Sequence, residues 1–585
     1  MTAPRAIHQL RTRAMNPTLS LLAVGAAAAL AAAALPAQAA QGWAATATKV
    51  VGPDIIAAAQ KAPMKDGETL RVAIALKIHD QAGLDAHVAA LAAGTTRHHL
   101  TSDEVMARHA PSAAEAEAVA AYLRDSGFTH VKIAKNRLVV TAAGTAKAAR
   151  AAFNTELAHF DVDGRDAYAN TTEAQVPAHL AGIVNAVLGL QTVSIGHAHH
   201  VRGHLDAAAA AKGVPVKGGV AFVHEAPDFS TLYGADSLPP ATNATIAIFT
   251  FGDVSQTVAD LNSFTDSYGW PRADIETVQT SEPTSDTSGL VEWNMDTQAS
   301  LAAAGGQVKK MLLYVGSDFS DESILSEFNA FVADNRAQVF NNSWGGCELA
   351  DQASGLGAAA DPIMEMAIAQ GQTFSVSTGD SGSYACGTRK GGQEWPASAA
   401  WVMAVGGTTV YNKPGVPGRY VREETWGCAN ATDCFNAGGT GGGTSTTVPQ
   451  PSWQKAVVSK GPGTRGRNLP DVAFDADWVS GIDIMFFGSY DPFQPIGGTS
   501  LSAPIFSGLW ARLQSMHDNK LMFPAMSVWG LYGASEAAAF HDVTVGTNGG
   551  WNALPGYDGT TGFGSFDAAK FNAFIDANPG SFIGQ

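Results

Sequence analysis

A serine in the last fifth of the chain lies where a helix is expected to begin. Residues 497–504 have the sequence Gly-Gly-Thr-Ser-Leu-Ser-Ala-Pro, and the apolar run 505–513 predicts a buried helix. Pro504 falls in its first turn, where a missing N–H costs little. Ser500 would then lie beside free backbone N–H groups at a helix N-terminus, which favours attack on a carbonyl and stabilises the resulting oxyanion. The simpler interpretation is that Thr499 or Ser500 only caps the helix.

A serine nucleophile needs a base, and the histidines of this chain are poorly placed to supply one. No histidine lies between His224 and His517, a span that covers the Ser500 turn. A histidine base would have to be His224, His517 or His541, and none of these lies in a glycine-rich motif centred on histidine. Either Ser500 is inert, then, or another type of group removes its proton.

Two carboxylates offer another base. Glu292 and Asp296 lie in a segment that is expected to be helical, so they share one face about a turn apart. Two ionised carboxylates there would repel each other, so the pKa of one should rise. A solvated acidic face is the commoner meaning of such a pair, but Leu290, Trp293 and Met295 flank it instead of lysines. A carboxylate also remains a base at acid pH, where histidine is mostly protonated.

A third acid, Asp380, lies in the segment Ser-Thr-Gly-Asp-Ser-Gly at 377–382, at the end of a predicted strand. Such segments are often simple turns. The functional alternative is that Asp380 donates a hydrogen bond to an oxyanion, which a protonated carboxylic acid can do and an ionised one cannot.

These elements, in this order, resemble the sedolisins, the serine-carboxyl peptidases. Six motifs carry the resemblance: Glu292-x-x-x-Asp296-x-Gln298, Ser343-Trp344-Gly345, Ser377-x-Gly379-Asp380-x-Gly382, Trp395-Pro396-Ala397-Ser398 with Val405-Gly406-Gly407-Thr408, Pro470-Asp471-Val472, and Gly498-Thr499-Ser500-x-x-x-Pro504. Each motif alone is weak, but six in order at plausible spacing are a strong signal.

The resemblance implies an endopeptidase that acts on proteins at acid pH. Ser500 would be the nucleophile, and Glu292 would take its proton and later give it to the leaving amine. Asp296 would orient Glu292, while Asp380 and the N–H of Ser500 would hold the oxyanion. The segment that would pair with the substrate backbone like an added strand consists of Ser343, Trp344 and Gly345.

The resemblance also implies one calcium ion near the C-terminus. Asp542 and Asp558 would supply carboxylate oxygens, the hard ligands that calcium takes. The carbonyl ligands would come from Val543, Leu554 and Gly556. The family tends to have glycine where Leu554 stands, a change that a carbonyl ligand tolerates if the backbone angles do. The alternative is a loop of Asx turns without an ion.

The N-terminus predicts export. Three arginines precede the apolar run 19–35, and Ala37-Gln38-Ala39 fits a signal-peptide cleavage site. We therefore expect a signal peptide over 1–39 and a mature protein, starting near Ala40, that is secreted to the medium or the periplasm without a membrane anchor. A lone membrane anchor is the alternative.

Residues 40–195 are predicted to form a ferredoxin-like α+β unit. Its alternating pattern includes capping boxes at 101–104 and 112–115, and a last helix is expected over 177–188. This unit resembles the activation prodomain of the family, which would act as an intramolecular inhibitor. Residues 196–219, with four histidines, are interpreted as an exposed linker where maturation cleavage occurs. Its histidines are expected to be a solvated, pH-sensitive tether; a metal site is the alternative.

Residues 220–585 are predicted to form the peptidase domain. Apolar strands at 245–250, 308–315, 338–340, 373–377 and 402–405 alternate with helices at 286–304, 321–334 and 357–370. This pattern indicates a doubly wound parallel sheet, and the resemblance implies that the sheet is subtilisin-like. Cys428 and Cys434 would close a short disulfide loop, which leaves Cys347 to pair with Cys386; free thiols are the alternative.

The net charge of the chain limits the classes of partner that we expect. The formal net charge is −17, which disfavours nucleic acid. We expect protein or peptide substrates and a monomer. Acidification should release the prodomain by protonating carboxylates and histidines at its contact. Two other classes stay open, a histidine-based subtilase and a non-catalytic secreted binding protein of the same fold.

Overall fold

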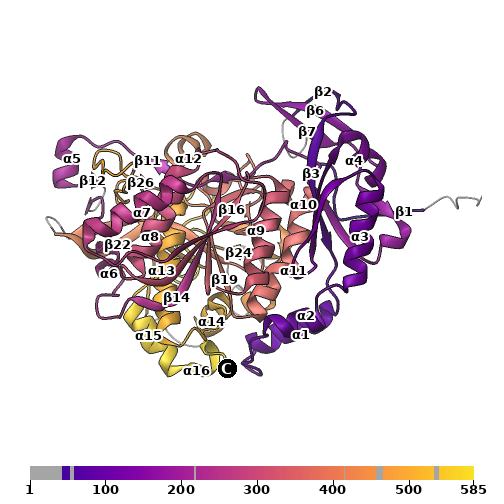
Figure 1. Cartoon of the computed structure of the whole chain (residues 1–585). Coiled ribbons are helices and arrows are strands. Elements are labelled where there is room, and N and C mark those ends of the chain that lie inside the picture. The colour runs from indigo at the N-terminus through magenta and orange to yellow at the C-terminus, as the bar shows by residue number, and fades with distance from the viewer. Residues whose placement is uncertain are drawn as a thin grey trace, which may run out of the picture. The chain divides into compact units, whose positions relative to one another are not determined.

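The computed structural model describes residues 42–52, 58–216, 219–413, 416–455, 457, 465–532 and 539–585. The predicted signal peptide lies outside these residues. Within them, no helix combines the length and the apolar character needed to cross a membrane. Trp43–Gln585 folds as one unit, in which an α+β domain (indigo to purple in Figure 1) packs on a larger α/β domain.

An antiparallel sheet of four strands organises the N-terminal domain. Its order is β4 (Thr129–Ile133), β5 (Val139–Thr145), β3 (Thr69–Leu76) and β9 (Val184–Leu188). Helix α3 (Ala113–Asp125) connects β3 to β4, and α4 (Ala146–Phe153) follows β5. This is the split βαβ order of a ferredoxin-like fold, as predicted. The remaining elements are β1 (Trp43–Ala45), β2 (Ala59–Pro63), α1 (Gln81–Ala92), α2 (Ser102–Arg108), β6 (Leu157–Val162), β7 (Arg165–Asn170) and β8 (Gln175–Pro177).

The two faces of β3 serve different purposes, because side chains alternate along a strand. Val72, Ile74 and Leu76 pack in the core beneath α3 and α4. Ala73 and Ala75 point to the opposite face and belong to the core shared with the α/β domain. Strand β3 is thus buried on both faces, which explains its nearly continuous apolar sequence.

Local sequence signals predicted some elements of this domain and failed for one. Both capping boxes are present, at Thr101 before α2 and at Ser112 before α3. The expected helix over 177–188 is wrong: a short 3-10 turn, Ala178–Leu180, leads into strand β9. Strand β9 is buried on both faces, so its apolar run could not be told from a buried helix by periodicity.

A parallel sheet forms the centre of the α/β domain, as predicted. Its order is β15 (Ile275–Gln279), β16 (Val308–Gly316), β14 (Ala241–Phe251), β17 (Val339–Asn342), β19 (Thr373–Ser377), β21 (Met403–Lys413) and β25 (Val472–Asp475). Strands β15 and β16 lie on one side of β14, and β17, β19, β21 and β25 lie on the other, which makes the sheet doubly wound. The carboxyl ends of such strands are where ligands bind.

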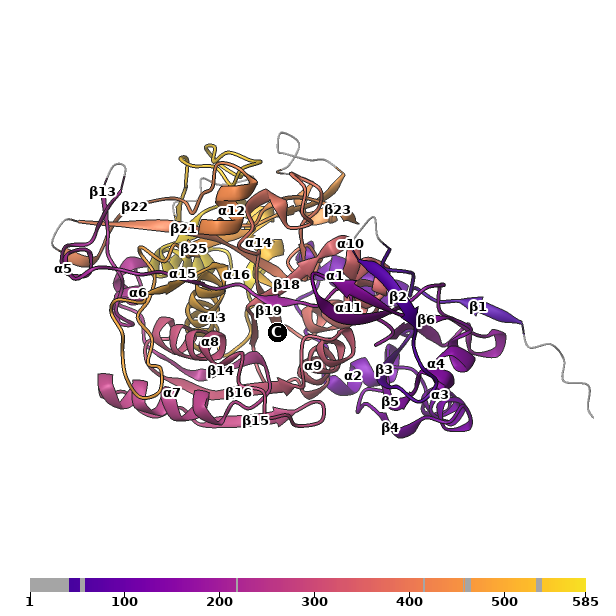
Figure 2. The same ribbon diagram turned by 90° about the horizontal axis from the view of Figure 1, so that it is seen from above.

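Helices cover this sheet in two groups (Figure 2). Helix α8 (Leu290–Ala303) packs between α7 (Ser255–Tyr268) and α13 (Thr499–Met516), and α13 crosses the strands from β14 to β25. Helices α9 (Asp321–Asp334) and α11 (Leu356–Ala369) form the second group, and they also contact the N-terminal sheet. The helices predicted from the sequence correspond to α8, α9 and α11.

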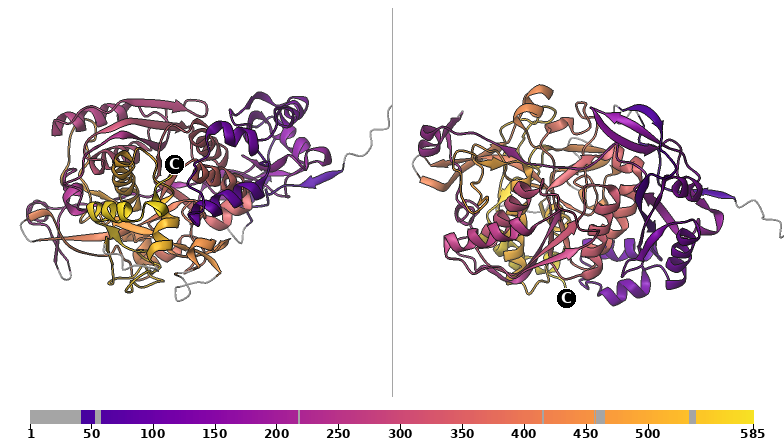
Figure 3. Two further views of the ribbon diagram at one scale, coloured as in Figure 1. Left: turned by 90° about the horizontal axis from the view of Figure 1, so that it is seen from below. Right: turned by 45° about the horizontal axis from the view of Figure 1, so that its top comes forward.

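Smaller elements complete the α/β domain, and those nearest the C-terminus, yellow in Figure 3, lie together. These elements are α6 (Asp228–Leu232), β13 (Gly219–Ala221), α10 (Glu348–Ser354), β20 (Glu394–Trp395), β22 (Val416–Thr425), α12 (Ala431–Ala437), β23 (Gly443–Pro449), β24 (Gly466–Leu469), α14 (Pro524–Tyr532), β27 (Phe540–His541), β28 (Ser565–Phe566), α15 (Ala568–Ala577) and α16 (Pro579–Phe582). The predicted disulfides, Cys347–Cys386 and Cys428–Cys434, are both present.

The linker differs from the expected exposed tether. Strand β10 (His197–Ala198) pairs antiparallel with β18 (Trp344–Cys347), and β11 (Val201–Arg202) pairs with β26 (Ile496–Gly497). His199, between them, is fully buried. Helix α5 (Ala207–Lys212) and strand β12 (Val214–Val216) follow. The expectation of a solvated tether is wrong for 197–202, because backbone hydrogen bonds to two strands, which no sequence pattern displays, hold this segment against the α/β domain.

Polar contacts join the N-terminal sheet to helix α9. Arg71 Nη2 lies 3.2 Å from Glu322 Oε2, and Gln191 Nε2 donates to Asp321 Oδ2 at 2.9 Å. On the neighbouring helix α11, Glu365 Oε2 accepts a hydrogen bond from Gln81 Nε2 at 2.8 Å. Carboxylates of the α/β domain are therefore buried by the docked N-terminal domain.

These carboxylates contradict part of the expectation that acid releases the prodomain by protonating carboxylates at its contact. Burial raises the pKa of Glu365 to about 8 and that of Asp321 to about 6. A carboxyl group whose pKa is higher in the docked state takes up a proton on docking, so acid strengthens its contribution. Protonating these two groups therefore favours docking instead of release. Glu322 acts in the same direction, because burial raises its pKa in spite of the opposing charge of Arg71.

His99 is a group whose protonation does oppose docking. Its ring lies against the backbone of the α/β domain, where a Cβ added at Gly371 would be 2.4 Å from Nδ1 and one at Gly584 would be 2.6 Å from Cε1. Its Nε2 is buried without a hydrogen-bond partner among the described residues. Burial, with smaller effects of His98 and His87, lowers the pKa of His99 to about 4. An undocked imidazole would bind a proton that the docked one excludes.

We predict that His99→Gln removes part of the acid weakening of domain docking. In the wild-type chain, His99 should weaken docking by about tenfold per pH unit between roughly pH 6 and pH 4. The measurement is hydrogen exchange of the α9 and α11 amides, corrected for the intrinsic rate at each pH. The chains should carry Ser500→Ala so that they stay intact.

His98→Gln is the matched control, because His98 is exposed and pairs with Glu104 inside its own domain. This control should keep the wild-type pH dependence. Equal pH slopes in the two variants would contradict the assignment to His99.

Candidate active site

Ser500 lies in the first turn of α13, as predicted. The N-cap residue is Gly498, with a φ of 109°, so Thr499 and Ser500 are the first two residues inside the helix. The alternative in which Thr499 or Ser500 only caps the helix is therefore wrong. The backbone N–H of Ser500 donates to the carbonyl oxygen of His199 at 3.0 Å, and Ser500 Oγ donates to the carbonyl of Ser343 at 3.2 Å. The hydroxyl and N–H of Ser500 thus both lie at the linker strand and its neighbour.

Asp380 lies at the same helix start. Its Oδ1 accepts hydrogen bonds at 2.8 Å from the backbone N–H and from the hydroxyl of Thr499. A Cβ added at Gly498 would lie 2.2 Å from the His199 carbonyl oxygen and 2.7 Å from Asp380 Oδ2, so both oxygens crowd one glycine. Only glycine can occupy that position.

The protonation of Asp380 follows from its surroundings. Its Oδ2 is buried and has no hydrogen-bond partner in the described part of the chain. Burial raises the pKa of Asp380 to about 6, although His199 and Thr499 act in the opposite direction. At acid pH the group is therefore a neutral carboxylic acid that can donate a hydrogen bond from Oδ2. A simple turn, the alternative interpretation of this segment, would not need such a buried carboxyl group.

Glu292 and Asp296 lie on α8 and are fully buried, so the solvated acidic face is wrong. Asp296 Oδ1 accepts a hydrogen bond from Ser343 Oγ at 2.6 Å. Burial, and then the charge of Glu292, raises the pKa of Asp296 well above its ordinary value. Asp296 therefore favours its neutral, protonated form.

Glu292 is occupied by the linker. Its Oε2 lies 2.5 Å from Nδ1 of His200, while its Oε1 has no hydrogen-bond partner among the residues described. Burial lowers the pKa of His200, but the hydrogen bond and charge of Glu292 outweigh burial and raise it. The carboxylate therefore holds a linker imidazole.

Ser343 connects these parts. Its hydroxyl binds Asp296, its carbonyl oxygen accepts from Ser500 Oγ, and the same carbonyl accepts from the backbone N–H of His199 at 3.2 Å. With His197 paired to Gly345, the linker extends β18 as an added antiparallel strand. The geometry thus places an extended peptide where Ser343, Trp344 and Gly345 were predicted to hold substrate.

The histidines considered as bases lie elsewhere. His224 is fully buried, with Nδ1 3.2 Å from Asp475 Oδ2. His517 Nε2 lies 2.9 Å from Oδ1 of Asn572, and His541 stacks on Tyr420. These partners account for the three rings in structural terms.

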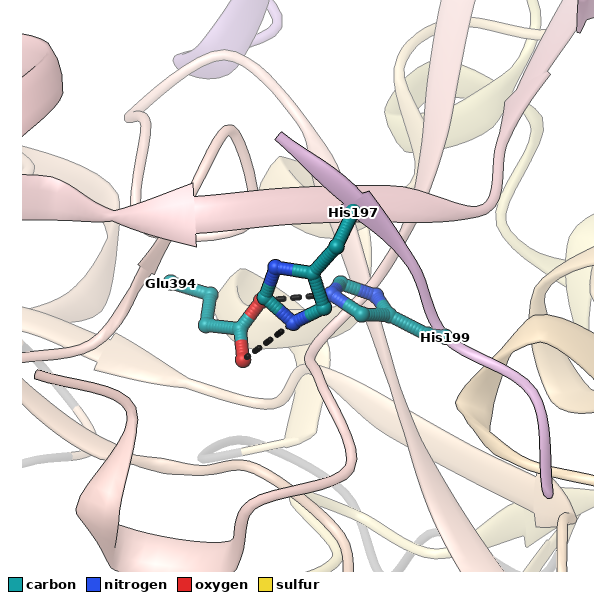
Figure 4. A group of neighbouring side chains, drawn as sticks. All are labelled: His197, His199 and Glu394. Carbon is teal, nitrogen blue, oxygen red and sulfur yellow. Dashed lines mark hydrogen bonds and ion pairs between the residues drawn. The ribbon is translucent and has the colours of Figure 1, made fainter. Parts of the chain in front are cut away.

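Four other groups at this site had no individual role predicted from the sequence. His199, His200, Glu394 and Ser377 meet there (Figure 4 shows Glu394 with His197 and His199). The histidine cluster of the linker was the signal for His199 and His200, although a solvated tether was expected there. Ser377 belongs to one of the six motifs, whereas no sequence pattern pointed to Glu394. His197, His199 and Glu394 could also group around a metal ion. However, Glu394 and Ser377 already occupy both ring nitrogens of His199, which favours an ion pair.

The predicted calcium residues come together in two loops. The backbone N–H of Gly556 donates to Asp542 Oδ2 at 2.9 Å, and that of Leu554 donates to Asp558 Oδ2 at 3.0 Å. Burial and the charges of both carboxylates raise the pKa of Tyr532. Two carboxylates with neighbouring carbonyls, including that of Val543, are an oxygen donor set that fits calcium. Asp558 also accepts from Thr560 and Thr561, as an Asx-turn loop would.

Two family models match the chain. The model described as "Pro-kumamolisin, activation domain" matches residues 57–193, and the model described as "Subtilase family" matches residues 294–532. The first match falls within the N-terminal domain. The second begins just after Glu292 and includes Asp380 and Ser500.

Curated relatives match over nearly the whole chain. Sedolisin of Pseudomonas sp. (strain 101) is 40% identical over 563 residues, which are 92% of this chain and 93% of that protein. The chain belongs to the sedolisin family. Xanthomonalisin of Xanthomonas sp. (strain T-22), another relative, is 36% identical over 87% of this chain and 66% of its own length.

A solved sedolisin structure agrees. It is described as Pseudomonas sedolisin (serine-carboxyl proteinase) complexed with two molecules of pseudo-iodotyrostatin. Its chain is 41% identical, is matched over its full length and 62% of this chain, and gives a TM-score of 0.57. This sedolisin-family chain is thus a serine-carboxyl peptidase with a subtilisin-like domain that follows an activation domain.

Proposed function

We propose that this chain is the zymogen of an exported, monomeric, acid-active endopeptidase that uses Ser500, Glu292 and Asp296, with Asp380 in the oxyanion hole. The observation that carries the proposal is the hydrogen bond from the N–H of Ser500 to the carbonyl of His199. An extended peptide carbonyl at a serine N–H in a helix N-terminus is the geometry that acyl transfer needs.

In the proposed reaction, Ser500 Oγ attacks the carbonyl carbon of the substrate while Glu292 takes the hydroxyl proton. The oxyanion accepts hydrogen bonds from the N–H of Ser500 and from the protonated carboxyl of Asp380. Glu292 then gives its proton to the leaving amine, and Asp296 keeps the carboxyl of Glu292 oriented. Water repeats these steps on the acyl-enzyme and releases the second product.

The linker is the proposed first substrate. Because the carbonyl of His199 lies at the N–H of Ser500, the bond in position for cleavage is His199–His200. His200 holds Oε2 of Glu292, which leaves Oε1, without a partner among the described residues, to accept the proton of Ser500. The prodomain thus inhibits by covering the cleft and by threading its own linker through it.

Export is supported by two features. The predicted signal peptide precedes the domains, and the two disulfides fit an oxidising compartment such as the periplasm or the medium. Proteins or peptides are the proposed substrates.

We predict that acidified wild-type chain produces a new N-terminus at His200, followed by trimming, and that Ser500→Ala abolishes it. N-terminal sequencing and intact mass spectrometry measure both results. Glu292→Gln should slow self-cleavage by about a hundredfold or more, because an amide takes up no proton.

His224→Gln is the control for the histidine-based alternative, and its Ser500-dependent cleavage should persist. Normal processing of Ser500→Ala, with no other peptidase present, would contradict the proposal. If no variant and no wild-type chain cleaves an unfolded protein at about pH 4, the chain is a non-catalytic binding protein of the same fold.

We predict that kcat/KM falls as pH rises through about 6, because Asp380 then loses the proton that it donates. A pH profile on mature enzyme measures this fall. Asp380→Asn, matured in trans by wild-type enzyme, should lose roughly 10–100-fold in rate but should lack the fall near pH 6, since an amide donates at every pH. An unchanged profile would contradict the role of Asp380.

We also propose one calcium ion held by Asp542, Asp558 and the carbonyls of Val543, Leu554 and Gly556. The ion would stabilise the loops of the α/β domain and takes no part in the reaction. The family resemblance and the oxygen donor set support this assignment.

We predict that chelation lowers the melting temperature of the mature enzyme by a few degrees, an effect of about 2–3 kcal/mol at saturating calcium. Differential scanning calorimetry, with and without chelator, measures this change. Asp542→Asn should lower the melting temperature and abolish the response to chelator. A wild-type melting temperature that chelation leaves unchanged would favour an Asx-turn loop without an ion.

A further inference from the structure

The linker shows which pocket receives the side chain before the cut bond. With the carbonyl of His199 at the N–H of Ser500, the imidazole of His199 occupies the first pocket on the N-terminal side of that bond, here called the S1 pocket. This side chain is fully buried. The pocket therefore selects among substrates by what it offers such a side chain.

The S1 pocket offers a buried carboxylate. Glu394, on β20, is only 1% exposed, and its Oε2 lies 2.5 Å from His199 Nε2 (Figure 4). On the other side of the ring, Nδ1 lies 2.7 Å from Ser377 Oγ. The occupant is thus held by a charged group and a hydroxyl.

Two glycines let a substrate side chain reach this carboxylate. A Cβ added at Gly345 would lie 2.5 Å from Glu394 Oε2 and 2.7 Å from His199 Cε1. One added at Gly379 would lie 2.4 Å from Glu394 Oε1. Larger side chains at these positions would fill the space that Glu394 and the occupant share.

The charges around the pocket also favour a cation as its occupant. Burial lowers the pKa of His199, but the charges of Glu394, Asp380 and Glu292 outweigh burial and raise it. For Glu394, burial alone would raise the pKa, whereas His199 and His197 hold it below its ordinary value. A buried carboxylate without a partner is costly. When the linker leaves, a basic side chain of the substrate is the natural replacement for His199.

We propose that the mature enzyme prefers a basic residue on the N-terminal side of the cut bond, and that Glu394 in the S1 pocket determines this preference. The proposal rests on the proposed peptidase function and adds its substrate class. Arginine and lysine reach deeper than histidine and can carry their charge to Glu394 at any pH where the enzyme works. An acidic residue there would leave two carboxylates facing each other.

The first test uses mature enzyme and peptides that differ only in the residue before the cut bond. At about pH 4, kcat/KM for the arginine peptide should exceed that for the glutamine and leucine peptides by about tenfold, and glutamate should be poorest. In Glu394→Gln, the ratio of arginine to glutamine should fall to near unity. Thermal unfolding of the variant checks that it is folded.

The second test uses the full-length chain and changes the occupant of the pocket. His199→Arg should keep the wild-type rate of self-cleavage after residue 199, whereas His199→Leu should slow it by about tenfold. In a Glu394→Gln background, the two linker variants should cleave at similar rates. This test does not depend on a purified mature variant.

The outcomes separate the two proposals. Cleavage with equal rates for arginine, glutamine and leucine, or a preference that survives Glu394→Gln, overturns the role of Glu394 while the peptidase function stands. Failure of wild-type enzyme to cleave every peptide and its own linker overturns the peptidase function and, with it, this specificity.

Discussion

The hydrogen bond from the N–H of Ser500 to the carbonyl of His199 is the interaction on which the active site depends. It fixes the register of the linker along β18, and the register decides which side chain enters each pocket. A shift of one residue would turn each linker side chain to the opposite face of the added strand. His200 would then leave Glu292, and Glu394 would lose His199.

Buried carboxylates contribute both to the catalytic centre and to the docking of the N-terminal domain. Asp380 and Asp296 hold protons because burial disfavours their charge, whereas Glu394 stays ionised because linker histidines compensate it. At the domain contact the same physics gives opposite signs: Glu365 takes up a proton on docking and His99 gives one up. The effect of acid on domain docking is thus the sum of opposing contributions from individual groups.

Sequence reasoning predicted the elements whose local pattern agrees with their tertiary role. The helix start at Ser500, the parallel strands and the capping box at Ser112 follow from turn residues, apolar runs and capping chemistry. It failed for β9, which is buried on both faces, and for 197–202. The linker strand exists only because β18 offers unpaired backbone groups, and a sequence does not show which strands have a free edge. The pocket role of Glu394 was missed because only the folded linker brings His199 to this carboxylate.

The disulfide Cys347–Cys386 has a consequence for the choice of expression host. It fastens the end of β18 to the segment that precedes Glu394, so one covalent bond joins two walls of the S1 pocket. Recombinant protein folded in a reducing cytoplasm would lack this bond. Such material would contain every residue of the catalytic centre but would have a loosened S1 pocket. Its measured preference among substrates would therefore be altered more than its rate of cleavage.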